Sequence, residues 1–254
     1  RIFSDYKLVP DIHKIFQTNV RDPDEREMDL HAQFAANFVG IRGFQEACQR
    51  YGAEVVNKAG RAWIDYAEAR LRDKLLQLPD TKCTYQEQVE DDLHDEPVTF
   101  KVTVQAKDGL LYADFTGTSP VFEGSKNIPL NATITTLWMV AKSMLDPRIP
   151  ASEGAFRPLR VIAPEGTIVN PQPPSAVGER ALSCQVLADV LMAAMSKLVP
   201  ERALAECGPH HGSICIVNDF PDLLRCLDAK ANGNWKVCML TQSTYSGAND
   251  IGAR

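Results

Sequence analysis

The chain has 254 residues, of which 44% are hydrophobic and 24% are charged, and its formal net charge is -6. This composition is typical of a soluble globular protein, and the negative charge disfavours a nucleic-acid partner, because contacts to phosphates require clustered lysine and arginine. No stretch approaches the roughly 20 apolar residues of a membrane span, and no positively charged leader with an apolar core is present. We therefore expect a cytoplasmic protein with no membrane partner.

Two long helices are predicted in the first third of the chain. From Leu30 to Cys48, apolar residues recur at spacings of three and four, which makes one helical face over residues 24–51. Gly52 ends this helix, and a second amphipathic helix is expected over 53–78, so that the pair forms an antiparallel hairpin. The side chains expected to face inward in the second helix are Val56, Ala59, Trp63, Tyr66, Leu71 and Leu75.

The apolar period changes to two after Pro97. Residues 98–104 and 111–115 alternate between apolar and polar side chains, and Asp108-Gly109 lies between the two runs. An Asp-Gly pair in this position is typical of a tight β-hairpin turn. We expect the apolar face of this hairpin to rest on the helical hairpin.

The remaining elements are predicted from shorter patterns. A third helix is expected over 132–145, followed by strands over 159–163 and 167–169, a fourth helix over 181–198, and strands over 213–217 and 236–241. The mixture predicts an α+β fold. We expect a lead-in and helical hairpin in residues 1–96 and a mixed α/β core in residues 97–254.

An acidic cluster occupies residues 90–96 and includes His94. Carboxylates beside a histidine can hold a divalent cation. The spacing fits no EF-hand loop, and a solvated turn before a strand also accounts for it, because water screens like charges. We favour the turn.

Adjacent histidines, His210 and His211, lie between Pro209 and Gly212. Histidine titrates near neutral pH and is a common metal ligand. On a strand the two rings would point to opposite faces, but the flanking proline and glycine favour a loop. One interpretation is a polar loop, and the other is that one or both rings face a substrate pocket.

A glycine turn at Gly178 opens into the fourth helix. A helix N-terminus favours an anion or a developing oxyanion, and Arg180 could bind a carboxylate with two hydrogen bonds. Cys184 lies in the first turn, where the helix dipole would depress the pKa of its thiol. The alternative is structural: Ser183 or Glu179 caps the helix and Cys184 packs in the interior.

A set of short segments occurs in a fixed order along the chain: Asn19-Val20-Arg21, Asp29-Leu30, Ala32-Gln33, Ala35-Ala36-Asn37, Asp114-Phe115, Gly117-Thr118, Asn127, Pro129, Ile149-Pro150, Gly154, Arg157-Pro158, Val161-Ile162-Ala163-Pro164, Gly166 and Gly252-Ala253-Arg254. The ordered set resembles the hydantoinase B/5-oxoprolinase family. Related subunits occur in biotin-independent ketone carboxylases. The departures from the family pattern lie at Arg180 and at the two histidines, so the resemblance implies a substrate that differs from those of the best-studied members.

The resemblance implies a hetero-oligomeric, ATP-dependent hydrolase of cyclic amides, in which ATP is held by a hydantoinase A-like partner. The family's metal motif lies in an N-terminal region that no residue here matches, so we expect an internal fragment. We expect the divalent metal in that missing region, ATP on the partner subunit, and no cofactor on this fragment. His210, His211 and Arg180 are the residues expected to line one wall of the small-molecule pocket.

Two alternatives remain open. In a ketone carboxylase the partner would phosphorylate an enolate or carbonate, and the shared scaffold does not separate this reaction from amide hydrolysis. The fragment could also be a structural module that docks the partner subunit and carries no reacting group.

Overall fold

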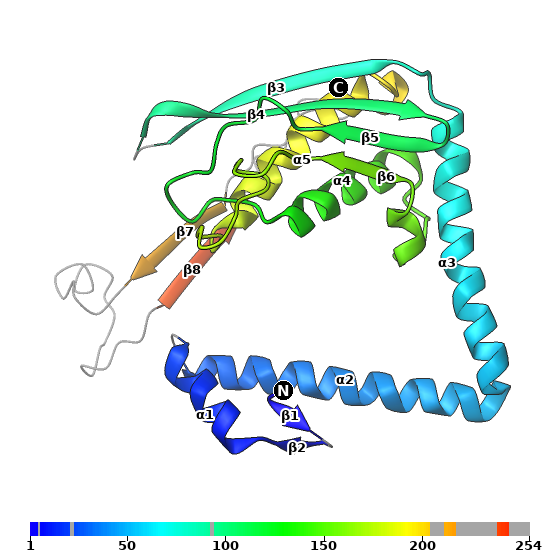
Figure 1. Cartoon of the computed structure of the whole chain (residues 1–254), viewed down its shortest axis with the longest axis vertical. Helices are drawn as coiled ribbons and strands as arrows, with labels where there is room; N and C mark the ends of the chain where they lie inside the picture. The colour runs from blue at the N-terminus through cyan, green and yellow to red at the C-terminus, as the bar shows by residue number, and fades with distance from the viewer. Residues whose placement is uncertain (5, 21–22, 92–93, 204–210, 217–237, 244–254) are drawn as a thin grey trace. The chain divides into compact units, whose positions relative to one another are not determined.

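The computed structural model describes residues 1–4, 6–20, 23–91, 94–203, 211–216 and 238–243. Two compact units are present, residues 1–59 with 212–242 and residues 60–211 with 243–254. The secondary structure confirms the α+β class (Figure 1). Within the described residues, no helix combines the length and the apolar character that a bilayer crossing demands. The expected division after residue 96 stays a prediction.

The first unit begins with two short strands and two helices. The ring of Phe3 stacks on that of Phe34 at 4.1 Å between centroids, and Glu27 accepts hydrogen bonds from His13 and Gln17 of the first helix. The ring stack ties the first strand to the second helix, and the Glu27 hydrogen bonds tie the two helices to each other. The elements are β1 (Phe3–Ser4), β2 (Lys7–Leu8), α1 (Pro10–Asn19) and α2 (Pro23–Tyr51), and β7 (His211–Ile216) pairs with β8 (Cys238–Ser243).

Gly52 separates α2 from α3 (Ala53–Leu76) and has a φ of 85°, a left-handed conformation that favours glycine. Both long helices are confirmed, while their packing as an antiparallel hairpin stays a prediction. The expected inward face of α3 was wrong in part: the side chains of Trp63 and Tyr66 are 57% and 46% exposed. Only the second half of α3 is buried, because only Ala67, Leu71 and Leu75 reach the hydrophobic core.

The second unit contains a four-stranded sheet in the order β3-β4-β5-β6. The predicted hairpin is confirmed: Lys107 pairs with Leu110 across a turn in which Asp108 and Gly109 have φ angles of 51° and 69°. β6 runs parallel to β5, and the chain between them includes α4 (Leu130–Leu145). The strands are β3 (Lys82–Asp91), β4 (His94–Lys107), β5 (Leu110–Asp114) and β6 (Leu159–Ile162).

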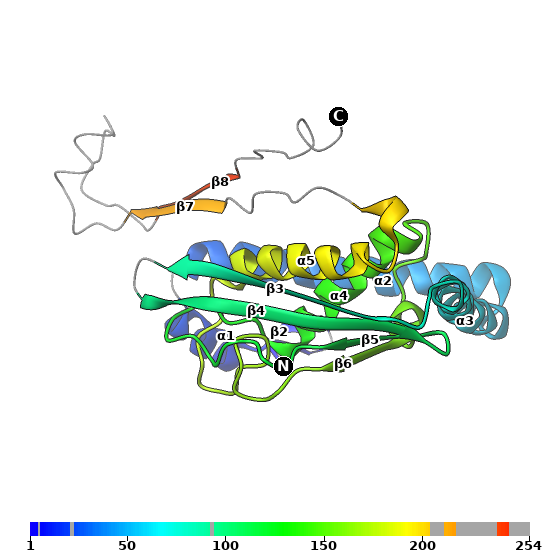
Figure 2. The ribbon, with the colours of Figure 1, turned by 90° about the horizontal axis from the view of Figure 1, so that it is seen from above.

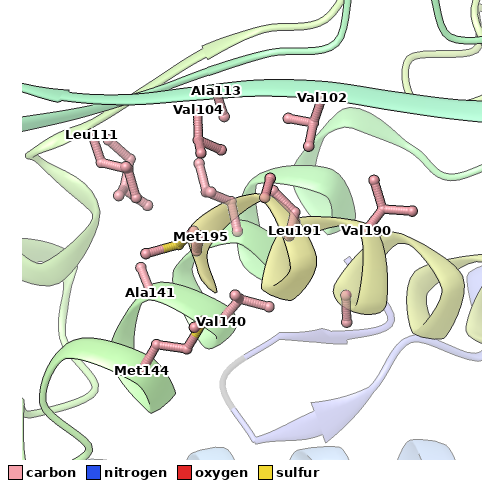
Figure 3. Packing of buried hydrophobic residues seen from close by; sticks show 14 of the residues in the cluster. Val102, Val104, Leu111, Ala113, Val140, Ala141, Met144, Val190, Leu191 and Met195 are labelled. Atoms are coloured by element: carbon pink, nitrogen blue, oxygen red, sulfur yellow. The ribbon is translucent and has the colours of Figure 1, made fainter. Parts of the chain in front are cut away.

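Two helices, α4 and α5 (Arg180–Ser196), cover one face of this sheet (Figure 2). The apolar face of the hairpin therefore packs on α4 and α5. The expectation that it rests on the long helices was wrong, except for the last turns of α3. Figure 3 shows the interlocking side chains, which are Val102, Val104, Leu111 and Ala113 from the strands and Val140, Ala141, Met144, Val190, Leu191 and Met195 from the helices.

Among the described residues, 167–169 do not form the expected strand and belong to none of the sheets. Thr167 instead forms single bridges to Pro120 and Asn170, and Gly166 turns the chain with a φ of 77°. The Asn170 side chain donates a hydrogen bond to the carbonyl of Ala163 at 2.8 Å. The backbone of Ile168 bonds to Ser119 and Ile128 of the loop after β5, at 3.1 and 2.7 Å, so the segment is held by single bridges and not by a strand ladder.

A short helical turn, η1 (Glu153–Phe156), approaches the backbone of α3 closely at Gly154. A Cβ atom on Gly154 would lie 1.8 Å from the carbonyl oxygen of Ile64. Backbone atoms cannot rotate away as a flexible side chain can, so this position requires glycine. The close approach explains why Gly154 belongs to the ordered set of segments found in the sequence.

We predict that Gly154→Ala destabilises the protein by about 2–3 kcal/mol, because the added methyl group forces η1 away from α3. Chemical denaturation measures the effect. Gly60→Ala is the matched control: Gly60 also lies on α3, nothing lies within 4 Å of its added Cβ, and a gain of about 0.5–1 kcal/mol is expected. Equal stabilities of the two variants would contradict the close approach.

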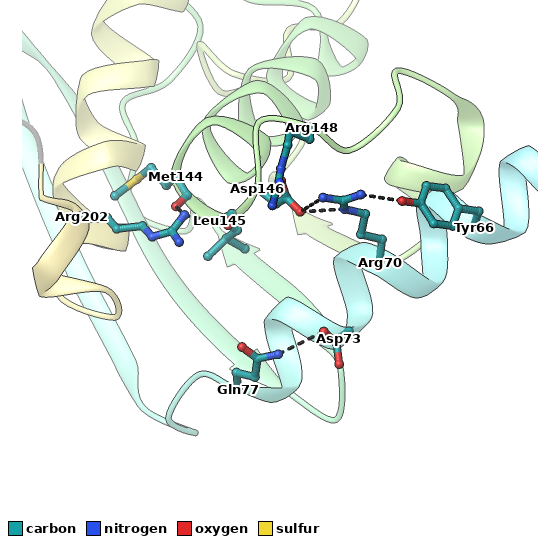
Figure 4. A network of polar contacts seen from close by, with 9 residues as sticks. All are labelled: Tyr66, Arg70, Asp73, Gln77, Met144, Leu145, Asp146, Arg148 and Arg202. Atoms are coloured by element: carbon teal, nitrogen blue, oxygen red, sulfur yellow. Dashed lines mark hydrogen bonds and ion pairs between the residues drawn. The ribbon is translucent and has the colours of Figure 1, made fainter.

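A polar network joins α3 to the end of α4 (Figure 4). The buried carboxylate of Asp146 accepts hydrogen bonds from the guanidinium of Arg70 at 2.6 Å and from the backbone N–H of Arg148 at 3.0 Å. Burial raises the pKa of Asp146, but the hydrogen bonds from Arg70 and Arg148 outweigh it and hold the pKa below its usual range. The ionised form is therefore the one that stabilises the fold.

Because the pKa of Asp146 is lower in the folded state, its contribution is present above the unfolded value of about 3.9 and is lost as the pH falls through the folded value. We predict that Asp146→Asn is less stable than the wild type at pH 7. The difference should shrink as the pH falls below about 4. Urea denaturation of both proteins across this range measures it, and a constant difference would contradict the assignment.

Candidate functional site

The loop between β5 and α4 is organised by one buried side chain. Asn127 is fully buried, and its amide group donates hydrogen bonds to the carbonyls of Phe122, Gly124 and Ala176 at 2.9 to 3.0 Å. Its side-chain oxygen accepts the N–H of Phe122 at 2.8 Å. The loop is thereby tied to the segment that leads into α5.

The start of α5 is anchored on the same loop. The N–H of Glu179 donates to the carbonyl of Ser125 at 2.9 Å, and the hydroxyl of Ser183 donates to the carbonyl of Lys126 at 2.6 Å. No side chain caps the helix at Glu179, so neither Glu179 nor Ser183 has the expected capping role. The anchoring instead comes from the loop backbone, which holds the helix start in place.

Arg180 is the first residue of α5 and is exposed. Within the described residues, its guanidinium donates one hydrogen bond, which goes to the carbonyl oxygen of Val177 at 3.3 Å. Its position at the positive end of the helix suits an anion-binding group. The expected role of Arg180 on a pocket wall stays a prediction.

A pocket of about 300 Å³ lies where the loop, the helix start and the β3–β4 hairpin meet. This volume is at the lower end of the range for small-molecule sites. The ammonium group of Lys126 lies 5.7 Å from the centroid of the Phe122 ring, on the pocket wall. The lining residues are Val89, Glu90, Val98, Phe100, Phe122, Lys126, Ile168, Leu182, Ser183 and Val186.

The pocket was not predicted from the sequence. Most of its lining residues are isolated apolar side chains from segments far apart in the chain, and no periodic pattern marks them as one surface. The only available signal was Asn127, adjacent to Lys126, in the ordered set of segments.

The strand β3 was also not predicted from the sequence, because polar side chains interrupt its alternation of apolar and polar residues after Tyr85.

The side chains of the two histidines lie outside the described residues. His210 lies outside them. His211 is the first residue of β7, but its side chain is not among the described parts. Their expected place on a pocket wall beside Arg180 stays a prediction.

The acidic cluster falls at the connection between β3 and β4, where Asp91 pairs with His94. Asp92 lies outside the described residues. Glu90 and Asp91 thus belong to the end of β3, and His94 to Glu96 belong to the start of β4, so the expectation of a turn before the strand was wrong for these residues. In the part of the chain that is described, no group of three or more His, Cys, Asp and Glu side chains is arranged to hold a metal ion, so we assign no metal ligand.

Two alternatives were open for Cys184, a thiol with a depressed pKa at the helix start and a thiol that packs in the interior, and the structure supports the second. Burial raises the pKa of the Cys184 thiol, and the opposing effects of a hydrogen bond with Thr136 and of the Arg180 charge are smaller. The thiol lies among apolar side chains of the core, where the thiolate is poorly solvated. Cys184 is accordingly a packing residue in this structure.

We predict that Cys184 reacts slowly with iodoacetamide at neutral pH, because only the thiolate reacts. The rate of modification, followed by peptide mass spectrometry from pH 6 to 10, should rise with a midpoint above the ordinary value of about 8.5. Cys184→Ser identifies the modified peptide. A midpoint below about 8 would show instead that the helix start activates the thiol.

Known proteins with similar sequences are named as subunits of enzymes that act on cyclic amides. The family model described as hydantoinase B/oxoprolinase matches residues 1–248. A protein of Pseudomonas sp. (strain NS671), named as the candidate B subunit of a D-/L-hydantoinase, is 32% identical over 206 residues, which cover 76% of this chain and 35% of that protein. The beta subunit of the caprolactamase of Pseudomonas jessenii is 27% identical over 243 residues, 94% of this chain and 40% of that protein.

Two solved structures share the fold. The crystal structure of ATP-dependent caprolactamase from Pseudomonas jessenii superposes with a TM-score of 0.77 at 25% identity, over 84% of this chain and 38% of that chain. A nucleotide-free structure of acetone carboxylase superposes with a TM-score of 0.66 at 16% identity, over 84% of this chain and 31% of that one. The chain thus spans less than half the length of the proteins it matches.

Proposed function

Because the chain belongs to the hydantoinase B/oxoprolinase family, we propose that it forms part of the hydrolytic subunit of an ATP-dependent hydrolase of cyclic amides. The observation that carries the proposal is the similarity to one of the caprolactamase subunits over 94% of the chain. The fold match to the ATP-dependent caprolactamase supports it. The substrate class is a hydantoin, an oxoproline or a lactam.

The proposed chemistry begins on a partner. Amides resist hydrolysis because resonance strengthens the C–N bond and makes the carbonyl carbon less electrophilic. A hydantoinase A-like partner transfers the terminal phosphoryl group of ATP to the amide oxygen and releases ADP. Water then adds to the activated carbon, the C–N bond breaks and inorganic phosphate leaves, so that the ring opens to an amine and a carboxylate. The relatives named as B and beta subunits support the existence of a partner. We propose that ATP and a divalent ion bind outside the described residues, in a cytoplasmic complex.

This chain contributes a wall of the substrate site in the proposal. Arg180 lies exposed at the positive end of α5, where its guanidinium and the helix dipole together favour negative charge. The role we assign to it is to hold the anionic group of the activated substrate. We propose that His210 and His211 polarise the same substrate. None of the steps that we assign to this chain uses a metal ion.

A ketone carboxylase is the second candidate. It rests on the acetone carboxylase structure, which at 16% identity shows the fold alone. A structural docking module is the third candidate, and the exposed apolar side chains of α2, among them Phe38, Ile41 and Phe44, favour it. These side chains leave an apolar helix face available to another surface.

The test is ATP turnover by the full-length chain together with its partner. We predict that hydantoins, oxoproline or lactams stimulate ATP hydrolysis with release of the ring-opened acid, whereas ketone plus bicarbonate do not. Turnover with ketone and bicarbonate alone would instead establish the carboxylase.

Substitutions separate a catalytic wall from a docking module. Loss of a charge-assisted hydrogen bond costs about 1.5–3 kcal/mol, so Arg180→Ala should lower kcat/KM by roughly 10- to 100-fold without dissociating the complex. Arg160→Ala, an exposed arginine on β6, is the matched control and should leave the rate unchanged. The docking module predicts unchanged kcat in Arg180→Ala, His210→Ala and His211→Ala, together with loss of the complex in Phe44→Asp.

A further inference from the structure

The long strand β3 forms one edge of the four-stranded sheet (Figure 1). It pairs with β4 on one side, and within the described residues no strand pairs with its other side. At 10 residues, β3 is longer than an average strand of roughly 5–6 residues. An edge of this length presents a row of backbone N–H and C=O groups with which a further strand can pair.

The alternation of the ladder shows which backbone groups of β3 point outward. On β4, the N–H and C=O groups of Thr99 and Lys101 bond to the loop after β5. Phe100, which lies between them, therefore directs its own groups to the opposite side, where its partner on β3 is Glu87. The neighbours of Glu87 on β3 follow the reverse pattern. The residues of β3 that direct their backbone groups away from the sheet are Thr84, Gln86 and Gln88.

The exposed side chains of β3 are arranged symmetrically about Gln86. They alternate with less exposed side chains, and they are Lys82, Thr84, Gln86, Gln88 and Glu90. When a second β3 runs antiparallel with Gln86 opposite its own copy, Lys82 of each strand lies opposite Glu90 of the other. Opposite charges in such a position stabilise a strand pair by about 0.2–1 kcal/mol. The charges of β3 are thus complementary to those of a second β3.

The two charged groups nearest to this edge are compatible with such a pair. Asp80, just before the strand, accepts a hydrogen bond from Gln105 of β4, so its carboxylate is held on the side away from the edge. Lys197, just after α5, donates a hydrogen bond to the carbonyl of Thr84 at 2.6 Å. A backbone carbonyl has two lone pairs, so Thr84 also accepts the N–H of Gln88 from a second copy.

We propose that β3 pairs with β3 of a second copy of this chain, antiparallel about Gln86, and joins the two sheets into one. The main-chain hydrogen bonds of Thr84, Gln86 and Gln88 supply the affinity, and the pairs of Lys82 with Glu90 set the register. The two-fold relation is the commonest one among soluble oligomers. The pairing does not depend on the reaction that the chain catalyses.

A disulfide across the two-fold axis tests the pairing in the complex of the full-length chain with its partner. Gln86→Cys places two thiols on directly opposite residues, whose Cα atoms lie about 5.5 Å apart in a hydrogen-bonded pair, a distance that a disulfide spans. We expect oxidation with copper phenanthroline to shift the chain to a covalent dimer on a non-reducing gel. Peptide mass spectrometry identifies the link, and the wild type measures the background from the native cysteines.

Thr84→Cys and Gln88→Cys are the matched controls, because both residues are exposed on the same strand. Each variant alone should give no dimer above background, since the two copies of either residue lie about 14 Å apart along the strands. The two variants expressed together should form the disulfide, because Thr84 lies opposite Gln88. Equal dimer yields from all three single variants, or no dimer from Gln86→Cys, would overturn the proposal.

Charge reversal tests the register by sedimentation velocity. Lys82→Glu or Glu90→Lys alone places like charges opposite each other on both sides of the axis, and each should weaken association of the two copies about tenfold. The double variant should restore it. Lys107→Glu, an exposed lysine at the end of β4, is the control and should change nothing. Thermal unfolding shows that each variant is folded, and a double variant no stronger than the single ones would refute this register.

Hydrogen exchange distinguishes a second copy from another strand at the same edge. Pairing of two copies protects the amides of Gln86 and Gln88, and Lys82→Glu should remove this protection. Protected amides in a complex in which Gln86→Cys forms no covalent dimer would show that a strand of the partner, or of the rest of the full-length chain, covers β3. That result would overturn the proposal.

Discussion

Burial of one face of the four-stranded sheet is the constraint on which the second unit depends. The strands β4 and β5 place every second side chain on this face, from Phe100 to Phe115, and all of these side chains are buried. The helices α4 and α5 cover it, as the strict alternation requires. A shift of register by one residue would turn this entire set toward water. The position of α5, and with it the pocket, follows from this packing.

The candidate site is built from backbone more than from reactive side chains. Asn127 ties the loop after β5 to the segment before α5, and Ser183 ties α5 back to that loop. Together these bonds fix the helix start beside the apolar wall of the pocket. A preformed arrangement of this kind lowers the cost of ordering when a ligand binds.

The ordered segments that reveal the family are mainly structural. Asn127 organises a loop, Gly154 permits a backbone contact with α3, and Gly166 adopts a left-handed turn. Their identities follow from geometry that other residues cannot satisfy. The resemblance to the family therefore rests in part on residues whose contacts here are structural.

The amino-acid sequence was sufficient for elements whose signal is local. The two long helices, the β4–β5 hairpin with Asp108-Gly109, and α4 and α5 were all predicted, because helical period, alternation and turn residues act over a few neighbouring positions. The family resemblance was likewise contained in the order of its segments.

Only the tertiary structure decided which surfaces meet. It placed α4 and α5, rather than the long helices, under the sheet, turned residues 167–169 into a loop, and brought Phe100, Lys126 and Val186 to one pocket. It also decided between the two alternatives for Cys184, because desolvation depends on neighbours that are distant in the chain. Contacts between distant residues leave no period in the sequence, and for that reason the pocket could not be predicted from it.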